Sequence, residues 1–365
     1  MLGFSRLVGR ASQAMLKDPY GKKLVKHTQQ DLNAMLQSHA RYVAHQGGMR
    51  AQLAHTNLDG LNLANRNLEE IDFTGASLVG ASFYGSNLYR VSLYCADLRD
   101  CDMRYCKLTR ADLRGASFRG ARLSFSVLDQ ADLRSGSMMY AGAAPSIESG
   151  ENSGVDFSNC SMKGVSFGNA KLDGANFTGA LLHGASFKNA NITNAVFKGA
   201  VLTGVNLDDL KLPPESLEGV VRDISPDARA RVGQYKVALE GHERWVASAG
   251  KEGAAAVLEG ADLRALEKLL SGRKLTGLLA RKAIGIEMDF SGSELQAAKF
   301  DGADLRGANF SKADLRGVSF KGAKLAHARF DGANLGALAL GENMLAADLT
   351  DAEVSEQQLQ AAIRS

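Results

Sequence analysis

The sequence predicts a mainly β fold, a solenoid of five-residue repeats with helical caps and a helical linker. Three observations predict it. Leu or Phe recurs at every fifth position over long stretches, a small residue stands two places before most of these, and glycine or asparagine often stands three places before. Segments with helix-capping residues flank the repeats.

The five-residue period fits neither the helical period of about 3.6 nor the strand period of about 2. The central Leu or Phe runs in register over residues 53–138, 157–212 and 290–340. Positions two apart in an extended segment share a face, so the small and the central residue both point inward. Because five is odd, the chain must bend once per repeat, and glycine and asparagine tolerate the positive φ of a bend.

The pattern Ala-[Asp/Asn]-[Leu/Phe]-x-Gly, as written across residues 303–307, resembles the repeat of the pentapeptide-repeat family. The resemblance covers more than half of the chain. It implies a right-handed quadrilateral β-solenoid with four repeats per coil and coils stacked at about 4.8 Å. It also implies a non-catalytic protein that binds other proteins and whose C-terminal end can dimerise.

We expect five segments along the chain. They are an N-terminal helical cap (1–52), a first solenoid (53–212) with a polar loop (139–154), a helical linker and cap (213–289), a second solenoid (290–349) and a C-terminal capping helix (350–365). Ser355 and Gln358 have the spacing of a capping box at the start of the last helix.

A repeated pair of a histidine and an aromatic residue indicates two copies of one module. His39 and Tyr42 precede the first solenoid, and His242 and Trp245 stand in the same relation to a later apolar repeat. The open first coil of a solenoid exposes unpaired backbone and an apolar interior. We therefore interpret these four residues as structural parts of two caps, rather than as metal ligands or catalytic groups.

Helix starts are predicted at Asp18-Pro19 and Ser225-Pro226, because each pairs an N-cap residue with proline at the first helical position. Residues 1–17 and 264–285 also have apolar residues at helical spacing with basic residues between them. We expect residues 1–17 to form a flexible or capping helix and residues 264–285 to form a helix packed on the solenoid wall. Contact with a partner or with an anionic membrane surface is the alternative.

Composition and motifs argue against several classes of function. The formal net charge of +3 in 365 residues favours neither a nucleic-acid binder held by bulk charge nor an acidic mimic of one. No phosphate-binding, dinucleotide-binding or zinc-protease motif occurs, so we expect no enzymatic activity, cofactor or metal. The cysteines, at positions 95, 101, 106 and 160, lack CxxC spacing and are interpreted as reduced thiols in a cytoplasm.

Outward positions of the first solenoid supply the candidate binding surface. With four repeats per coil, residues twenty apart stack into columns, such as Arg114 with Arg134 and Arg99 with Arg119. Arginine and tyrosine are enriched in protein interfaces, although charged columns can also serve only to keep a β wall soluble. The candidate partner-binding wall comprises Tyr84, Tyr89, Tyr94, Arg90, Arg99, Arg110, Arg114, Arg119 and Arg134.

The sequence therefore predicts a cytoplasmic, non-catalytic protein-interaction scaffold whose protein partner it does not identify. One alternative comes from relatives that bind DNA gyrase or topoisomerase as mimics of DNA, which requires a strongly acidic wall. Residues 90–134 instead contain nine Lys or Arg. A membrane-surface or anion-binding adaptor is the other alternative, and a homodimer stays open.

Overall fold

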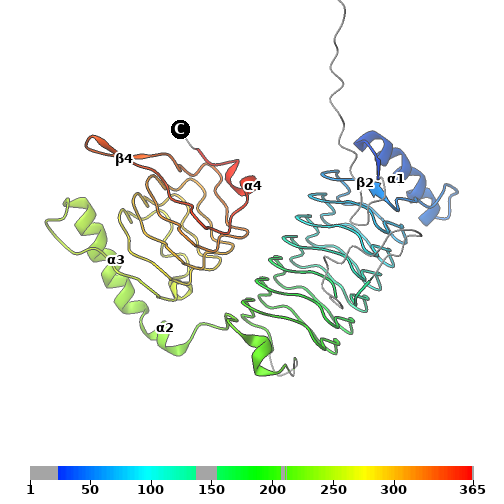
Figure 1. Cartoon of the computed structure of the whole chain (residues 1–365), viewed down its shortest axis with the longest axis horizontal. Coiled ribbons are helices and arrows are strands. Elements are labelled where there is room, and N and C mark those ends of the chain that lie inside the picture. The colour runs from blue at the N-terminus through cyan, green and yellow to red at the C-terminus, as the bar shows by residue number, and fades with distance from the viewer. Residues whose placement is uncertain (1–23, 137–153, 207–209, 211, 364–365) are drawn as a thin grey trace, which may run out of the picture. The chain divides into compact units, whose positions relative to one another are not determined.

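Successive coils of the chain pair in parallel, twenty residues apart. Asn57 bridges Ser77, Ser77 bridges Asp97, and Asp97 bridges Ser117, and each of these residues directly precedes a central Leu or Phe. Four repeats therefore make one coil, and Figure 1 shows the coils stacked side by side. The bends lie at left-handed backbone two residues after the central residue, as at Gly80 with φ 67°.

The computed structural model describes residues 24–136, 154–206, 210 and 212–363. Contacts divide the chain into two compact units, Met1–Arg222 and Asp223–Ser365, and each contains one solenoid with its own hydrophobic core. The predicted helix over residues 1–17, the helix start at Asp18-Pro19 and nearly all of the loop 139–154 lie outside the described residues.

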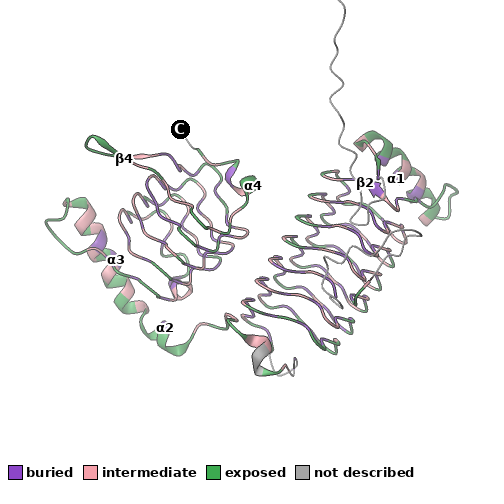
Figure 2. Cartoon of the chain, in the orientation of Figure 1, coloured by how far each residue is buried: buried purple, intermediate pink, exposed green. Residues whose placement is uncertain are grey.

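The interior of each solenoid is a column of large apolar side chains. Nearly all described central residues are buried, which supports the predicted register, and Figure 2 shows burial alternating with exposure along the coils. In the first solenoid Phe177 stacks between Phe157 and Phe197, with ring centroids 5.2 and 4.8 Å away. Dry, stacked rings of this kind supply apolar burial at every coil.

Small polar residues inside the coils donate to the backbone. The thiol of Cys106 donates to the carbonyl of Phe83 over 2.9 Å, and the hydroxyl of Ser126 does the same to Met103 over 2.5 Å. All four cysteines are free and buried. These interior thiol and hydroxyl groups are therefore hydrogen-bonded, so their burial leaves no polar atom unpaired.

The first solenoid is interrupted between residues 136 and 154. Ser117 bridges Asp156, 39 residues later, so this coil contains nineteen residues more than a regular one. Phe157 is consequently the central residue that follows Leu133 in the coil. Met138, which the five-residue register made the next central residue, lies outside the described residues.

The first solenoid also continues beyond its predicted end at residue 212. Val201 bridges Val221, and the amide of Leu202 donates to the carbonyl of Val221 over 2.9 Å. The turn η2 (Pro214–Leu217) lies inside this last coil. The boundary predicted at residue 213 was therefore wrong, because a 3₁₀ turn breaks the sequence pattern while the backbone still pairs.

The second solenoid begins well before the predicted residue 290. Val257 bridges Leu279, and Asp262 bridges Ile284. These spacings are two residues longer than a regular coil, and the turn η3 (Leu263–Leu266) accommodates the extra residues. The first coil of this solenoid thus lies inside the segment predicted to be a linker.

The amphipathic helix predicted over residues 264–285 is consequently wrong. Beyond η3 these described residues form coil, with bends and parallel bridges. Ala280 and Gly285 occupy the central positions, and the large Leu278 occupies the small one. This exchange of large and small residues hides the five-residue period and imitates helical spacing.

A hairpin of β3 (Leu338–Leu340) and β4 (Asn343–Leu345) interrupts the second solenoid. Ser319 bridges Asp348, 29 residues later, so the hairpin segment adds nine residues to that coil. Leu340, predicted as an interior residue, is 52% exposed in β3. The coil resumes after the hairpin, and α4 (Glu356–Leu359) follows with the capping box that Ser355 and Gln358 predict.

Helices stand before the first coil of each solenoid. The helix α1 (Gln29–Val43) begins after Thr28, which forms a capping box with Asp31. Strand β1 (Val25–Lys26) pairs in parallel with β2 (Thr56–Asn57) of the first coil. In the second unit α2 (Pro226–Ala230) has the predicted N-cap Ser225, and α3 (Val232–Ala247) follows it.

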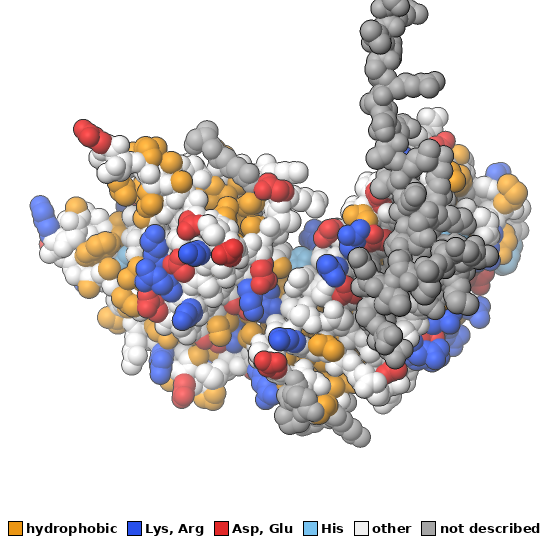
Figure 3. Space-filling view, in the orientation of Figure 1, with side chains coloured by type: hydrophobic (Ala, Val, Ile, Leu, Met, Phe, Trp, Pro, Cys, Tyr) orange, Lys and Arg blue, Asp and Glu red, His pale blue; other side chains and the backbone are white. Residues whose placement is uncertain are grey.

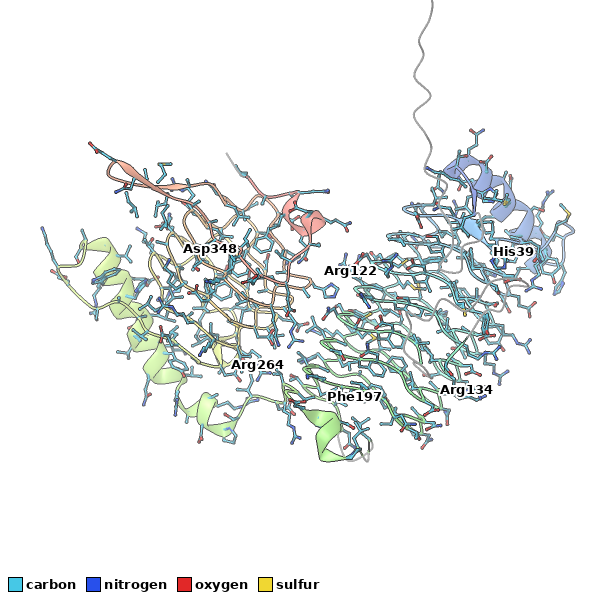
Figure 4. The ribbon with its side chains drawn as sticks, viewed as in Figure 1. His39, Arg122, Arg134, Phe197, Arg264 and Asp348 are labelled. Atoms are coloured by element: carbon cyan, nitrogen blue, oxygen red, sulfur yellow. The ribbon has the colours of Figure 1, made fainter. Side chains whose placement is uncertain are left out.

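The two caps share one buried arrangement. His39 of α1 and His242 of α3 are both fully buried, and the Nδ1 atoms accept the amides of Ala51 and Ala256 over 3.3 and 3.0 Å. The two Nε2 atoms are buried without a hydrogen-bond partner among the described residues. Figure 4 shows His39 beneath α1, at the end of the coils.

An aromatic ring covers each histidine. Tyr42 stacks on His39 with centroids 5.9 Å apart, and Trp245 stacks on His242 at 5.6 Å, both at an interplanar angle of 27°. Burial lowers the pKa of both imidazoles below the ordinary value. The geometry is that of a neutral, hydrogen-bonded histidine.

Candidate binding wall

The three tyrosines of the predicted wall lie on three different faces of one coil. We name these faces after a central residue: Tyr84 lies on the Met103 face, Tyr89 on the Leu108 face and Tyr94 on the Leu113 face. The guanidinium group of an arginine lies over each ring. The guanidinium carbon lies 5.1 to 5.6 Å from the ring centroid in the pairs Arg104–Tyr84, Arg90–Tyr89 and Arg114–Tyr94.

The predicted arginines are likewise spread over several faces. Arg114 and Arg134 lie on the Leu113 face, and Arg99 and Arg119 lie on the neighbouring face, named here the Phe118 face. Arg90 and Arg110 lie at the bend that follows the Leu108 face. Figure 4 shows Arg134 at the outer side of the coils. The nine predicted residues therefore do not form one continuous surface.

Carboxylates neutralise most of these arginines. In four repeats of the first solenoid an aspartate binds the arginine two residues later, with Nη2–Oδ2 distances of 2.6 to 2.7 Å in Asp97–Arg99, Asp102–Arg104, Asp112–Arg114 and Asp132–Arg134. Arg119 binds Asp156 at 3.3 Å, and Arg90 lies 3.6 Å from Glu70. The arginine columns therefore carry paired positive charge, because an aspartate stands beside the arginine on the same strand.

The pKa values show the same pairing. The hydrogen bond from Arg134 lowers the pKa of the Asp132 carboxyl, and the hydrogen bond to Asp112 raises the pKa of Arg114. These pairs are partly exposed, so each contributes little to stability. Figure 3 shows both signs of charge interspersed over the visible faces of the two units.

The Met103 face carries a feature that the sequence interpretation missed. Tyr84, Tyr105 and Phe125 form an aromatic ladder along three successive coils. The Tyr84 and Tyr105 centroids are 5.4 Å apart with rings at 69°, and Tyr105 and Phe125 stack at 5.3 Å and 16°. The three residues are 37%, 49% and 46% exposed. Large exposed side chains in contact with one another typically mark an interaction site.

The ladder stands where the backbone least favours large side chains. Tyr105 and Phe125 occupy the bend position and have φ of 61° and 63°. Left-handed backbone costs a non-glycine residue about 1–2 kcal/mol, and bulky residues are uncommon there. Because these rings stay exposed, burial in the core does not offset that cost. A role at the surface explains them better than a role in folding.

Basic side chains surround the ladder. Over the three coils that hold residues 102–105, 122–125 and 161–164, the Met103 face has three cations, Arg104, Arg122 and Lys163, and one carboxylate, Asp102. On the Leu113 face the same coils have three of each sign. Lys107, exposed on the adjoining face, adds a cation on the far side of the bend. We name Arg104, Lys107, Arg122 and Lys163 the basic rim.

None of the described residues forms a group of three or more His, Cys, Asp or Glu side chains placed to hold a metal ion. In the same parts of the chain no helix has the length and apolar character needed to cross a bilayer.

The fold and wall define a β-solenoid repeat protein. The family model described as pentapeptide repeats matches eight copies, over residues 67–104, 96–135, 153–189, 180–212 and 298–336. The chain belongs to the pentapeptide-repeat family. A search of curated proteins found no significant match.

Solved structures of pentapeptide-repeat proteins are similar to parts of the chain. Full-length QnrB1, a plasmid-mediated fluoroquinolone resistance protein, is 21% identical over 52% of this chain and 97% of its own, with a TM-score of 0.35. HetL of the cyanobacterium Nostoc sp. strain PCC 7120, a protein involved in heterocyst differentiation regulation, is 22% identical over 78% and 80%, with a TM-score of 0.22. Rfr23 of the cyanobacterium Cyanothece 51142 is 20% identical over 52% and 95%, with a TM-score of 0.16.

Proposed function

We propose that this protein is a non-catalytic protein-interaction scaffold that binds its partner at the Met103 face of the first solenoid. The observation that carries the proposal is the aromatic ladder: exposed, mutually packed rings, of which Tyr105 and Phe125 are held at strained bend positions. The backbone beneath it is hydrogen-bonded at every coil, so a partner meets side chains that lose little freedom on binding.

The wall does not favour a mimic of DNA. Such a mimic needs a continuous, uncompensated row of carboxylates. Here Asp97, Asp102, Asp112 and Asp132 are each tied to an arginine on the same strand. The four bends per coil support the square cross-section that the resemblance implies. The free, buried thiols fit the reducing cytoplasm that we propose as its compartment.

Quantitative capture of partners tests the scaffold function. Tagged wild-type protein and the variant Tyr105→Ser/Phe125→Ser would be incubated with extract of the native host, and bound proteins compared by mass spectrometry. We expect the variant to lose at least one partner that Tyr94→Ser, a matched aromatic replacement on the Leu113 face, retains. Identical capture by all three proteins would refute binding at the ladder. Thermal unfolding of each variant checks that its coils are intact.

A further inference from the structure

We infer that the ladder and its basic rim bind an amphipathic α-helix whose apolar seam is flanked by acidic residues. The inference rests on the proposed function and names the chemistry of the partner. Three properties of the surface carry it: the spacing of the rings, the orientation of the rings and the sign of the surrounding charge.

The spacing of the ladder is close to the pitch of a helix. Successive ring centroids are 5.4 and 5.3 Å apart, and the coils that carry the rings stack at about 4.8 Å. An α-helix advances about 5.4 Å per turn, so the side-chain rows of a helix lying along the coil axis stay within about 1 Å of the gaps between three rungs. An extended strand repeats its same-face side chains about every 6.8 Å, so it departs from the rungs by about 2 Å at each coil. An apolar seam at i, i+3 or i+4, and i+7 is the pattern that such packing selects.

The orientation of the rings argues against nucleic acid as the occupant. Single-stranded nucleic acid binds when bases stack on open aromatic faces. Here Tyr105 and Phe125 stack on each other, Arg104 covers Tyr84, and the ring of Phe125 lies against Gly164. Aliphatic side chains of a helix need no such open face. The positive edges of aromatic rings also attract carboxylates rather than cations.

The positive charge around the ladder favours a helix with acidic residues on both sides of its apolar seam. The basic rim supplies Arg104, Arg122 and Lys163 on one side and Lys107 on the other. Arg104 forms an ion pair with Asp102, whereas Lys163 is exposed beside the last rung. Carboxylates on both sides of the seam would meet these cations, which steers association and fixes orientation.

Binding of synthetic peptides to the full-length protein tests this inference. The probe is a fluorescein-labelled helical peptide of about 18 residues, with leucine on the i, i+3/i+4, i+7 seam and glutamate elsewhere, which spans about five turns. Three comparison probes would be a peptide of equal composition whose leucines are moved to alternate positions of one segment, the seam peptide with lysine for glutamate, and a single-stranded oligo-dT. We expect the acidic helix to bind at least about tenfold more tightly than each of the others.

Charge variants locate the site. We expect Lys163→Glu and Lys107→Glu each to weaken the acidic helix about tenfold at low salt and much less at high salt, because screening removes the contribution of an exposed charge. Lys188→Glu, an exposed lysine elsewhere on the Leu108 face, is the matched control and should change little. Phe125→Ser should weaken binding at both salt concentrations, because its contribution is apolar.

Each contrary outcome overturns a definite part of the inference. Equal binding of the alternating peptide refutes a helical occupant, and equal binding of the lysine peptide refutes acidic flanks. Tighter binding of oligo-dT makes the occupant a nucleic acid. No measurable binding of the acidic helix at about 100 µM refutes the partner chemistry as a whole. If host capture still depends on Tyr105 and Phe125 in that last case, the scaffold function stands and only this inference fails.

Discussion

The ring of Phe125 lies where a side chain on Gly164 would stand. A Cβ atom on Gly164 would be 2.9 Å from Cδ1 of Phe125, a distance at which one of the two must move. Gly164 occupies the same bend position in the next coil, with φ 64°. The missing side chain therefore lets the last rung of the aromatic ladder lie against the wall.

Replacing Gly164 by alanine should displace that rung. Gly184 is the matched control, because it stands at the same bend position with φ 63° and has no atom within 4 Å of its would-be Cβ. Both substitutions carry the cost of left-handed backbone, about 1 kcal/mol. Only Gly164→Ala should also weaken binding of the acidic helix, by moving Phe125. Equal binding by the two variants would show that the position of Phe125 is immaterial.

The fold was largely predictable because its period is rigid. Every central residue must point into one narrow interior, so a five-residue spacing of Leu and Phe fixes the register of the first solenoid. The spacing did not predict the coils where the large and the small residue exchange positions, as at Leu278 and Ala280. It also did not predict the coils that contain extra residues, as at η3 and the β3–β4 hairpin. Backbone pairing tolerates such insertions, and the sequence pattern does not display them.

Phe177 offers the sharpest test of the register in the first solenoid. Its ring is fully buried and stacks on Phe157 and Phe197. Phe177→Asp would place a carboxylate in a dry column, at a cost of several kcal/mol. We expect the variant to unfold at much lower urea concentration or to be insoluble. Thr178→Asp, one residue later on the outer wall, should change the midpoint little, and a stable Phe177→Asp protein would contradict the interior position.

The buried thiols should resist modification in the folded protein. Burial raises the pKa of Cys106 to about 12, and it raises the pKa of Cys101 and Cys160 as well. The thiolate is the reactive form, so a disulfide reagent at pH 8 should label none of the cysteines until denaturant is added. Rapid labelling without denaturant would show that the coils open.

Cys106→Ser should be tolerated better than Cys106→Ala. Serine already fills this column at Ser86 and Ser126, where the hydroxyl donates to a carbonyl as the thiol of Cys106 does. Alanine would leave the carbonyl of Phe83 without that donor. In urea, the free energy of unfolding should be about equal for the wild type and Cys106→Ser. It should be about 1 kcal/mol lower for Cys106→Ala. A reversed order would mean that the volume of the side chain, rather than its donor, matters there.

The candidate wall was only partly predictable from the sequence. Counting residues twenty apart placed Arg114 above Arg134 correctly, but it did not show that each arginine binds the aspartate two residues before it. Tyr105 and Phe125 were overlooked because they stand where glycine or asparagine is usual. An aromatic residue at a bend position, repeated twenty residues later, is the signal that would have found the ladder.

The second cap should lose stability on acidification through His242. Its Nδ1 accepts the amide of Ala256, and burial lowers its pKa below the ordinary value. The charged group that acts on this imidazole is Glu243, which forms an ion pair with Arg273 at 2.7 Å, and the backbone of Leu275 and Thr276 lies beside the ring as well. Protonation would remove the Ala256 hydrogen bond and leave a buried cation.

The direction of the pH effect follows from the lowered pKa. Above about pH 6.5 the imidazole is neutral in both the folded and the unfolded chain, and its full contribution to stability is present. Below that pH the unfolded chain takes up the proton first, so the free energy of unfolding falls until the pH reaches the folded pKa.

Trp245, the single tryptophan, stacks on His242, so its fluorescence during urea unfolding at pH 7, 6 and 5 reports this cap. His242→Asn, which keeps an acceptor for Ala256 but does not titrate, should flatten the decline, whereas the matched His39→Asn in the first cap should leave the tryptophan transition unchanged. A decline that persists in His242→Asn would assign the pH dependence to another group.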